Sequence, residues 1–449
     1  MTAWVASWQA SPQPVWRADF LFPANVPSEL HDQTVRQVAR LSLGGPRLRI
    51  VLSNAYGKQP LEVGGATVAR PRWISENGND GEDRKNGEDG ERGVSGESGV
   101  SGGSGGSGGS GAVVEGSLRT VTFGGREAAT ILPGASLISD PVALPVSALS
   151  RLSVSVYLPT AAPVDTFHWD GRQTGWIVSG DQTRASSLRL TDPARQRTTA
   201  RPLLTGIQVE TGSAVPAVVV IGDSITDGAM ASVDRDRRWP DFLAERLAPR
   251  GVAVVNAGIS GARLLADGMG VNALARLERD VLAQPGVRSV IVMLGINDIA
   301  WPGTAFARDA RRPALDALTA GYRQLIEQAR SRGLRVVGAT LAPFEGALPG
   351  TPLDDYYDPD KDALRRQVND WIRHGDAFDA VIDFDAVLRD PAQPARIAAR
   401  FDSGDRLHPG DEGNRAMADA VDLDALLPGL GARPAAAATP LTPSSSTEP

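Results

Sequence analysis

The alternation of apolar and polar residues changes character once along the chain, near residue 215. Before that point the period is two, with apolar residues alternating with polar ones in the segments 47–53 and 151–158. This alternation is typical of antiparallel strands that bury one face and expose the other. Segments 34–43 and 118–123 are further candidate strands. We therefore expect residues 1–210 to form a β-sandwich of half-buried strands.

After residue 215, short apolar runs alternate with longer stretches of helical periodicity. The runs are 217–221, 252–255, 287–294, 334–340 and 380–382. One stretch between them places Trp239, Phe242 and Leu247 on one helix face, with Pro240 in the first turn, where proline is favoured. Strands that alternate with helices imply right-handed crossovers. Residues 211–427 are therefore predicted to form an α/β domain, a parallel sheet with helices on both faces.

Two segments have compositions that oppose folding. Residues 76–111 are almost wholly Gly, Ser and charged or amide residues, and they end in SGGSGGSGGSG. Such a segment buries too little apolar surface to offset the entropy of ordering it, so we predict a disordered insertion in a loop of the sandwich. Residues 428–449, rich in Pro, Ala and Ser, are predicted to be a disordered tail. Ser104 and Ser107 match the G-x-S-x-G pattern, but no strand precedes them, so neither is expected to be a nucleophile.

Charge and composition argue against several kinds of partner, site and cellular location. The 449 residues carry 46 basic and 53 acidic side chains, a net charge of -7, without a Lys/Arg block, so no nucleic-acid partner is expected. No apolar stretch of about 18 residues occurs, so no membrane span is expected. The absence of cysteine excludes disulfides, thiolate catalysis and Cys-ligated zinc. The start, MTAWVASWQAS, lacks the basic and apolar regions of a signal peptide, which favours a cytoplasmic protein, with a secreted mature form as the alternative.

Polar residues and glycines follow three of the predicted strands. GDS (222–224) follows the first strand, NAGISG (256–261) the second and GIND (295–298) the third. In an open parallel sheet, ligands bind outside the carboxyl ends of the strands. A hydroxyl, a glycine loop and a carboxamide are thus expected at one edge of the sheet.

A histidine stands near an acid before the last helical stretch, in DRLHP (405–409). Asp405 precedes His408 by three residues, so in a turn its carboxylate reaches one ring nitrogen while the other nitrogen faces outward. Together with Ser224 this supplies a nucleophile, a base and an orienting acid, the parts of a Ser-His-Asp arrangement. Asp402 is the alternative orienting acid.

Other titratable residues have structural explanations. His31, His168 and His374 are expected to be structural, the last because it ends a helix. Asp223 and Asp227 are expected to cap or support the turn that carries the serine. No HExxH motif or histidine cluster occurs, so a metal-dependent hydrolase would have to hold its ion with carboxylates alone. We expect no metal and no other cofactor.

Four blocks in the C-terminal half, GDSITDG, NAGISG, LGIND and DRLHP, resemble the signature of the SGNH (GDSL) hydrolase superfamily over residues 215–425. The resemblance implies a three-layer, flavodoxin-like α/β domain in which Ser224 is the nucleophile, His408 the base and Asp405 its orienting acid. It also implies an oxyanion hole formed by the N–H of Ser224, the N–H of Gly258 and the side chain of Asn297. Glycine allows close approach of the backbone, and an amide supplies a neutral donor, which fits both assignments.

The N-terminal half carries a second resemblance. ASWQASP and LRIVLSNAYG are similar to segments of bacterial members with a leading β-sandwich, some of them associated with deacetylating plant polysaccharides. Ala262 and Asn414 depart from the family pattern, which has Asn and an aromatic residue there. These departures bear on substrate preference rather than on the chemistry.

Together these features predict a serine esterase for short-chain acyl esters, including O-acetyl groups on carbohydrate. Trp169, Asp170, Arg172 and Trp176 are expected to form one wall of the site, with Asp170 and Arg172 contacting the alcohol side of the substrate. A structural Asp170–Arg172 ion pair is the alternative for these two residues. The sequence leaves the oligomeric state open.

Two other functions compete with this prediction. Amphipathic tryptophan rings suit sugar faces, so a glycan-binding protein is one alternative, with burial in the core as the competing explanation for the rings. A lipase-like enzyme for long acyl chains is the other. The tryptophans concerned are Trp4, Trp8, Trp16, Trp73, Trp169 and Trp176.

Replacing residues 76–111 by a short turn is expected to leave turnover and melting temperature nearly unchanged. A solvated loop contributes little to packing, and a shorter loop is slightly cheaper to close. Ester hydrolysis and thermal unfolding of the shortened protein check this. A large loss of activity with the sandwich still folded would instead show that the insertion binds or gates the substrate.

Overall fold

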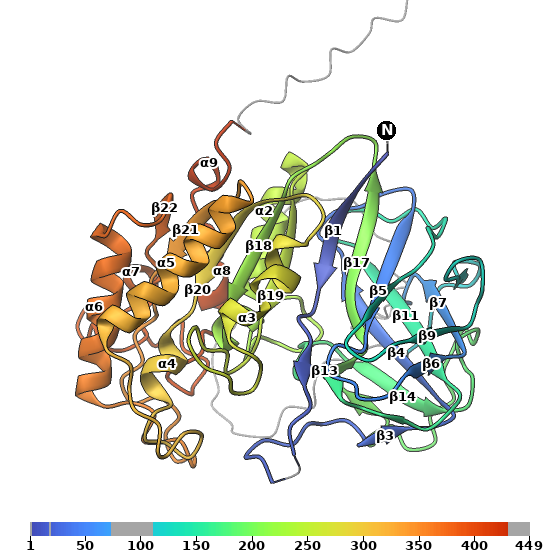
Figure 1. Ribbon diagram of the computed structural model, residues 1–449, viewed down its shortest axis with the longest axis horizontal. Helices are drawn as coiled ribbons and strands as arrows, with labels where there is room; N and C mark the ends of the chain where they lie inside the picture. The colour runs from blue at the N-terminus through green and yellow to red at the C-terminus, as the bar shows by residue number, and fades with distance from the viewer. Residues whose placement is uncertain (1, 18, 73–110, 430–449) are drawn as a thin grey trace, which may run out of the picture.

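The computed structural model describes residues 2–17, 19–72 and 111–429 (Figure 1). The predicted insertion lies outside these ranges apart from Gly111, and so does the predicted tail apart from its first two residues. No helix in the described part of the chain is both long and apolar enough to span a membrane.

The N-terminal half consists of antiparallel sheets. A four-stranded sheet has the order β1–β17–β5–β10, and a six-stranded sheet has the order β15–β14–β4–β11–β7–β8. Their strands are β1 (Ala3–Gln9), β4 (Gln33–Arg40), β5 (Leu48–Ser53), β7 (Gly65–Ala69), β8 (Arg119–Val121), β10 (Ser136–Ile138), β11 (Arg151–Leu158), β14 (Gly175–Ser179), β15 (Arg197–Thr198) and β17 (Leu204–Thr211). Short strands complete this half: β2 (Gln13–Pro14), β3 (Glu29–Leu30), β6 (Leu61–Val63), β9 (Ala129–Ile131), β12 (Ala162–Pro163), β13 (Thr166–His168) and β16 (Arg201–Pro202).

One apolar core joins the two large sheets. Ile50 and Ile207 from the four-stranded sheet pack in the same cluster as Val154 and Val35 from the six-stranded sheet, and all four are buried. Alternating apolar residues on facing strands produce such a core, as in a sandwich. The prediction of a β-rich N-terminal half beside an α/β unit is confirmed.

The expectation of half-buried strands is wrong for β11, because its second face is covered as well. Ser155 on that face is buried and accepts a hydrogen bond of 2.7 Å from Nε of Arg36, which is also buried. The other guanidinium nitrogens donate to the carbonyls of Gly111, Gln182 and Ala185. A buried guanidinium requires such partners, so this face of the sheet is closed by polar packing rather than by solvent.

The C-terminal half contains one parallel sheet with the order β19–β18–β20–β21–β22. The strands are β18 (Ala217–Gly222), β19 (Ala253–Gly258), β20 (Val287–Met293), β21 (Arg335–Ala339) and β22 (Ala380–Ile382). This order, 2-1-3-4-5 along the chain, is the flavodoxin-like one, and it confirms the predicted α/β fold. The register pairs Gly222 with Gly258 on one side and with Met293 on the other, so three strands end at the same edge.

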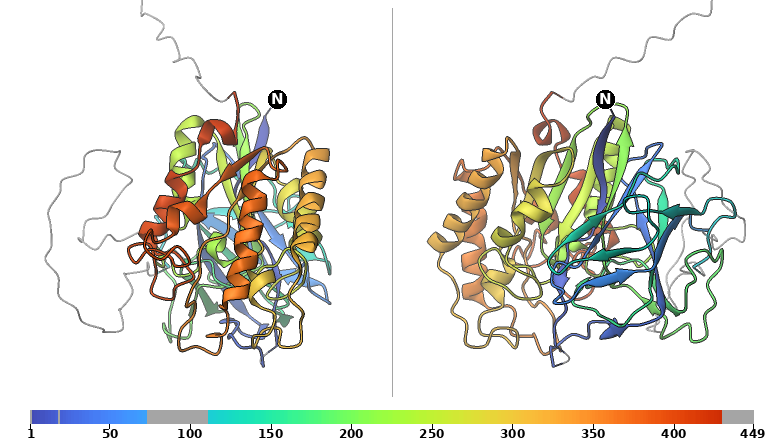
Figure 2. Two further views of the ribbon diagram at one scale, coloured as in Figure 1. Left: turned by 90° about the vertical axis from the view of Figure 1, so that its left-hand side faces the viewer. Right: turned by 45° about the vertical axis from the view of Figure 1, so that its right-hand side comes forward.

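Helices cover both faces of this sheet, which makes three layers (Figure 2). Leu277, Leu325 and Val368, from α3, α5 and α6, pack on one face, while Phe242 and Met417, from α2 and α8, pack on the other. The helical segments are α1 (Ser224–Asp227), α2 (Trp239–Leu247), η1 (Ala248–Arg250), α3 (Ala273–Leu277), η2 (Glu278–Leu282), α4 (Ile296–Ala300), α5 (Leu315–Ser331), α6 (Pro359–His374), α7 (Phe384–Leu388), α8 (Asp411–Asp419) and α9 (Leu423–Leu426).

Strand β1 of the sandwich lies beside the parallel sheet, next to β19 (Figure 1). Its residue Ala6 donates its N–H to the carbonyl of Pro285, and Gln9 donates its side-chain amide to the carbonyl of Asp280. Ser42 accepts the N–H of Val254 at the start of β19. The two halves are thus joined by backbone as well as side-chain hydrogen bonds.

Candidate active site

The turn that follows β18 places Ser224 at the edge of the parallel sheet. Asp223 caps the single-turn helix α1 by accepting the N–H of Ile225 at 3.0 Å. Ser224 is the first residue of α1, and Gly228 ends it with a φ of 95°, which favours glycine. A Cβ at Gly222 would clash with the side chain of Thr226. The two glycines therefore allow the sharp change from strand to helix that exposes the serine.

The structure brings Ser224, His408 and Asp405 into one hydrogen-bonded line. Nε2 of His408 lies 2.8 Å from Oγ of Ser224, and Nδ1 lies 2.6 Å from Oδ2 of Asp405. Since a carboxylate only accepts, the hydrogen of the neutral ring sits on Nδ1 and leaves Nε2 as the acceptor for the serine hydroxyl. This is the arrangement of a base that can take a proton from the serine.

Asp405, rather than Asp402, contacts the histidine. Its second oxygen accepts the N–H groups of Leu407 and His408 at 2.9 and 2.8 Å. Asp402 instead accepts the N–H groups of Gly404 and Arg406, so its hydrogen bonds shape the turn and do not reach the ring. Burial opposes ionisation of Asp405, but the hydrogen bond from the His408 ring, the positive charge of that ring when it is protonated, and the N–H groups of His408 and Leu407 outweigh it and lower the pKa of Asp405 to about 2. The carboxylate therefore stays charged beside the ring.

Asn297, at the start of α4, presents its side chain to the same cavity as the serine. Its Oδ1 accepts the hydroxyl of Tyr356 at 2.7 Å, and Nδ2 donates one hydrogen to the carbonyl of Ala262 at 3.0 Å. These two contacts fix the orientation of the amide. The second hydrogen of Nδ2 has no acceptor in the described part of the chain and is left to face a ligand.

The prediction that the N–H of Gly258 donates to an oxyanion is wrong. That N–H donates to Oδ1 of Asn256 at 2.8 Å, and a Cβ there would clash with the backbone of Asp227. Gly258 thus serves the close approach of β19 and α1, and it does not line the cavity.

Gly261, three residues further along the same loop, lines the cavity beside Ser260. It has a φ of 73°, and its N–H meets no acceptor among the residues described. The N–H of Ser224 is likewise without an acceptor there. The motif NAGISG contains both glycines, and only the path of the loop after β19 decides which one faces the serine.

The cavity at this edge has a volume of about 190 Å³ and mainly apolar walls. Phe22 and Trp169 of the sandwich stack with their ring centroids 5.4 Å apart. Trp301 and Phe306 of the α/β half stack in the same way, at 4.3 Å. The other residues around the cavity are Asp170, Arg172, Ser224, Ala229, Met230, Ser260, Gly261, Met269, Asn297, Leu348, Leu353, Tyr356, Asp405, Leu407 and His408. Both halves of the chain therefore build the walls.

Three of the four predicted wall residues lie at this cavity, and Trp176 does not. Asp170 and Arg172 form an ion pair of 3.1 Å, and Arg172 also donates to the carbonyl of Ala231, so the structural explanation holds for this pair although both residues line the cavity. Trp176 is buried inside the sandwich against Val38 and Leu188, because its position on β14 faces that side of the sheet. Its prediction as a wall residue is therefore wrong.

The glycan-binding alternative also rested on Trp4, Trp8, Trp16 and Trp73. Those that lie among the described residues do not form an exposed aromatic surface. Trp8 is buried, and Trp16 donates its indole N–H to the carbonyl of Phe22. Trp4 lies under the guanidinium of Arg49. Trp73 lies outside the described residues.

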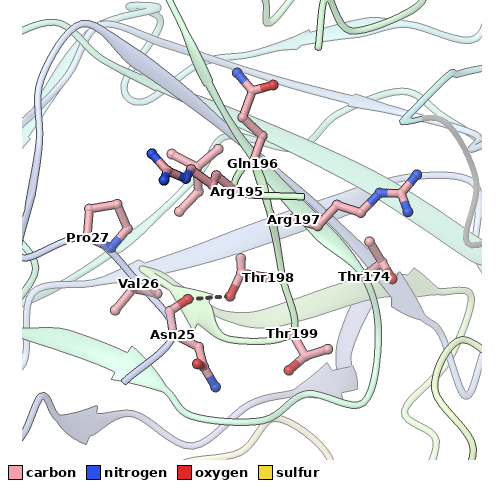
Figure 3. A pocket seen from close by; sticks show the side chains of 10 residues that line it. Asn25, Val26, Pro27, Thr174, Arg195, Gln196, Arg197, Thr198 and Thr199 are labelled. Atoms are coloured by element: carbon pink, nitrogen blue, oxygen red, sulfur yellow. Dashed lines mark hydrogen bonds between the residues drawn. The ribbon is translucent and has the colours of Figure 1, made fainter. Parts of the chain in front are cut away.

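A second cavity of about 520 Å³ lies in the sandwich (Figure 3). Its polar walls include Asn25, Arg195, Arg197 and Thr198, and Thr198 donates to the carbonyl of Asn25 at 2.7 Å. It is larger than the cavity at Ser224, but it contains no serine or histidine. The chemistry of the lining residues, rather than volume, therefore identifies the candidate site.

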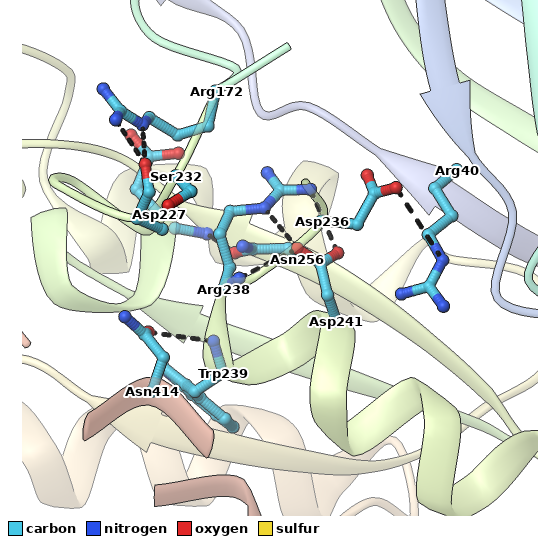
Figure 4. A network of polar contacts seen from close by, with 12 residues as sticks. Arg40, Arg172, Asp227, Ser232, Asp236, Arg238, Trp239, Asp241, Asn256 and Asn414 are labelled. Atoms are coloured by element: carbon cyan, nitrogen blue, oxygen red, sulfur yellow. Dashed lines mark hydrogen bonds and ion pairs between the residues drawn. The ribbon is translucent and has the colours of Figure 1, made fainter. Parts of the chain in front are cut away.

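Asn414 and Ala262, which depart from the family pattern, both hold parts of the site. Figure 4 shows the side chain of Asn414 accepting the N–H of Trp239, at 2.9 Å. Its amide nitrogen donates to the carbonyl of Pro409, next to His408, at 2.9 Å. Asn414 thus ties the turn that carries the histidine to the start of α2, while Ala262 supplies the carbonyl that fixes Asn297.

Metal ligation was the other catalytic alternative. Within the described ranges, no three His, Asp or Glu side chains are arranged to hold a metal ion. His374 is exposed and pairs with Asp370 at 3.0 Å, and His31 is exposed in a turn. His168 is buried where the two halves of the chain meet, and it contacts Asp227.

Comparisons with known proteins concern the C-terminal half. Residues 218–421 match the family model described as GDSL-like lipase/acylhydrolase. Solved structures that align with the chain include an aryl esterase of M. smegmatis, with 19% identity and a TM-score of 0.37, covering 47% of this chain and 100% of the other. An acetyl xylan esterase aligns with 24% identity and a TM-score of 0.31, covering 45% and 96% of the two chains. A variant of an acetyl-xylooligosaccharide esterase of Geobacillus aligns with 22% identity and a TM-score of 0.32, covering 46% and 94%. No curated protein matches the sequence.

Asp223→Asn is expected to raise the melting temperature more at pH 8.5 than at pH 5. Asp223 is fully buried and its Oδ2 has no partner among the described residues, so burial raises its pKa to about 7 against the opposing N–H of Ile225 and charge of His408. For a carboxyl whose folded pKa is raised, the stability it contributes is present below about pH 4 and is lost as the pH rises through about 7. Asn at position 223 has no carboxyl to ionise, so the variant does not lose this stability as the pH rises.

Calorimetry of the two proteins at both pH values checks this expectation. Asp422→Asn, at the exposed helix cap of α9, is the control and should act equally at both pH values. An equal effect of Asp223→Asn on the melting temperature at pH 5 and pH 8.5 would show that burial does not raise the pKa of Asp223.

Proposed function

We propose that the chain, whose residues 218–421 match the GDSL-like lipase/acylhydrolase family model, is a serine esterase for short-chain acyl esters, including O-acetyl groups on carbohydrate. The observation that carries the proposal is the line of hydrogen bonds from Ser224 through His408 to Asp405, at 2.8 and 2.6 Å, at the edge of the cavity. A serine next to a neutral imidazole with an ionised orienting acid is an activated nucleophile.

In this mechanism His408 moves one proton twice. Nε2 takes the proton of Ser224 as Oγ attacks the ester carbonyl carbon, and Asp405 stabilises the imidazolium that forms. The same nitrogen then gives the proton to the oxygen of the departing alcohol, which leaves an acyl group on Ser224. Water, activated by His408, releases the acid in the second half of the reaction and restores the serine.

Three donors are available for the negative oxygen of the tetrahedral intermediate. They are the N–H groups of Ser224 and Gly261, which have no other acceptor among the residues described, and the second hydrogen of Asn297 Nδ2. Preoriented donors of this kind are worth about 3 to 4 kcal/mol of transition-state stabilisation each. Their orientation is fixed before substrate binds, because α1, the loop after β19 and Tyr356 hold them.

The size of the cavity supports a short acyl group. A volume of about 190 Å³ is close to that of cavities that hold a single benzene ring, on the order of 150 Å³. Trp301 and Phe306, which stack on each other, line this cavity and limit its size. Asp170 and Arg172 provide polar groups on the sandwich side of the cavity, which suits a hydroxylated alcohol such as a sugar.

Ser224→Ala and His408→Ala are each expected to lower kcat for an activated acetyl ester by at least about 10³-fold, since the two residues act as a unit. Asp405→Asn should cost less, because an amide oxygen still accepts the ring N–H while the charge is lost. Asp402→Asn, in the same turn, is the matched control and should retain most of the activity. Parental turnover by Ser224→Ala would show that the nucleophile is misassigned, and a larger loss with Asp402→Asn than with Asp405→Asn would exchange their roles.

The preferred acyl length is expected to lie between acetyl and butyryl. Each methylene contributes about 0.8 kcal/mol only when a pocket removes it from water, and a cavity of about 190 Å³ is too small to enclose a long chain. Measuring kcat/KM across C2 to C12 p-nitrophenyl esters checks this. Phe306→Ala should move the optimum to longer chains, and an optimum at C8 or above in the parent protein would establish the lipase-like alternative instead.

Binding and turnover experiments distinguish the esterase proposal from the glycan-binding alternative. A Ser224→Ala protein that binds acetylated polysaccharide, while the parent shows no turnover of any ester, would support a binding protein. Loss of the parent's ester hydrolysis on addition of a chelator would support the metal-dependent alternative.

A further inference from the structure

A buried histidine of the sandwich reaches the helix that carries Ser224. His168 lies on β13, and its Nε2 is 3.0 Å from Oδ1 of Asp227, the last residue of α1. Its Nδ1 is 3.0 Å from the carbonyl oxygen of Ser11. The side chains of His168 and Asp227 are only 4% and 2% exposed, so water does not screen this contact.

Both ring nitrogens of His168 face acceptors, so both carry hydrogen. The carbonyl of Ser11 can only accept, which requires a hydrogen on Nδ1. The carboxylate of Asp227 is an acceptor for a hydrogen on Nε2, so the two contacts together fit a ring with hydrogen on both nitrogens. Burial would raise the pKa of Asp227, but the charge and hydrogen bond of His168, the hydroxyl of Ser260 and the charge of Arg238 outweigh it and lower that pKa. The pair is thus a buried ion pair between the two halves of the chain.

The second oxygen of Asp227 holds the loop that lines the cavity. Oδ2 accepts both the N–H and the hydroxyl of Ser260, at 2.9 and 2.7 Å. Ser260 precedes Gly261, whose N–H is one of the proposed oxyanion donors. Asp227 therefore sets the separation between two donors, the N–H of Ser224 at the start of its own helix and the N–H of Gly261.

We propose that His168 is a positioning residue for the oxyanion hole: through Asp227 it holds Ser260 and Gly261 in register with Ser224, so the sandwich contributes to catalysis without touching the reacting atoms. The proposal rests on the proposed esterase function. A displacement of about 1 Å at a reacting centre can cost about 10²-fold in rate, so loss of the contact should appear in kcat. KM should change little, because the residue does not contact the cavity.

Two conservative substitutions separate the two ring nitrogens. The amide nitrogen of Gln is as many bonds from Cβ as Nε2, so His168→Gln keeps a donor toward Asp227 and loses the one toward Ser11. The amide nitrogen of Asn corresponds to Nδ1, so His168→Asn keeps the contact to Ser11 and loses the one to Asp227. His374→Gln removes a histidine from an exposed His–Asp pair and serves as the control.

We expect His168→Asn to lower kcat for p-nitrophenyl acetate by about 10- to 100-fold with KM within about twofold of the parent, while His168→Gln stays within about fivefold in kcat. Rates are referred to the fraction of folded protein, measured by thermal unfolding and by titration of the reactive serine. Nitrogen NMR of the parent should show His168 with hydrogen on both ring nitrogens. His374→Gln should match the parent.

Equal kcat values for the two His168 variants, whether both high or both low, would overturn the proposal, since a structural role alone does not distinguish the nitrogens. A spectrum with a single hydrogen on the His168 ring would also overturn it. If Ser224→Ala turns over the ester at the parental rate, the esterase assignment fails first, and that result is independent of any His168 variant.

Discussion

The candidate active site depends on one constraint, the register of three parallel strands. Gly222 pairs with Gly258 and with Met293, so the chain leaves the sheet at the same level on β18, β19 and β20. Ladder hydrogen bonds fix that register, and Ser224, the glycine loop and the amide of Asn297 therefore reach one edge together. His408, the proposed base, comes from a turn before α8. Asp405 and Asn414 hold that turn and bring His408 to the serine.

The second organising feature is the burial of charge where the sandwich meets the α/β half. Asp227 receives donors from His168 on one side and from Ser260 on the other. A buried carboxylate is costly unless its donors are all present, so this group makes the position of α1 dependent on the sandwich. The same dependence appears at the cavity, where Phe22 and Trp169 supply walls that the α/β half lacks. The N-terminal half is thus part of the site and not only an attachment.

Much of the fold and of the candidate site was predictable from the sequence alone. The two wrong residue assignments, Gly258 and Trp176, arose because a local sequence pattern does not show which residue faces the cavity. The period of two and the alternation of strands with helices predicted both architectures, and the spacing of Asp405 and His408 predicted a contact that the turn does make. Gly258 was misassigned because both glycines of NAGISG satisfy the sequence pattern. Trp176 was misassigned because alternation shows that a strand has two faces, without showing which face meets the cavity.

The sequence by itself determined the local features: strand and helix order, the turn around Ser224, and the Asp-x-x-His pair. Each follows from backbone preferences and side-chain reach within a few residues, which the chain encodes directly. Only the tertiary structure decided that Gly261 faces the cavity, that Tyr356 orients Asn297, and that His168 pairs with Asp227. Those contacts join residues far apart in the chain, 59 positions in the last two pairs. The first two depend on how loops of the α/β half meet at the edge of the sheet, and the third depends on how the sandwich packs against that half; residue periodicity carries no information about either.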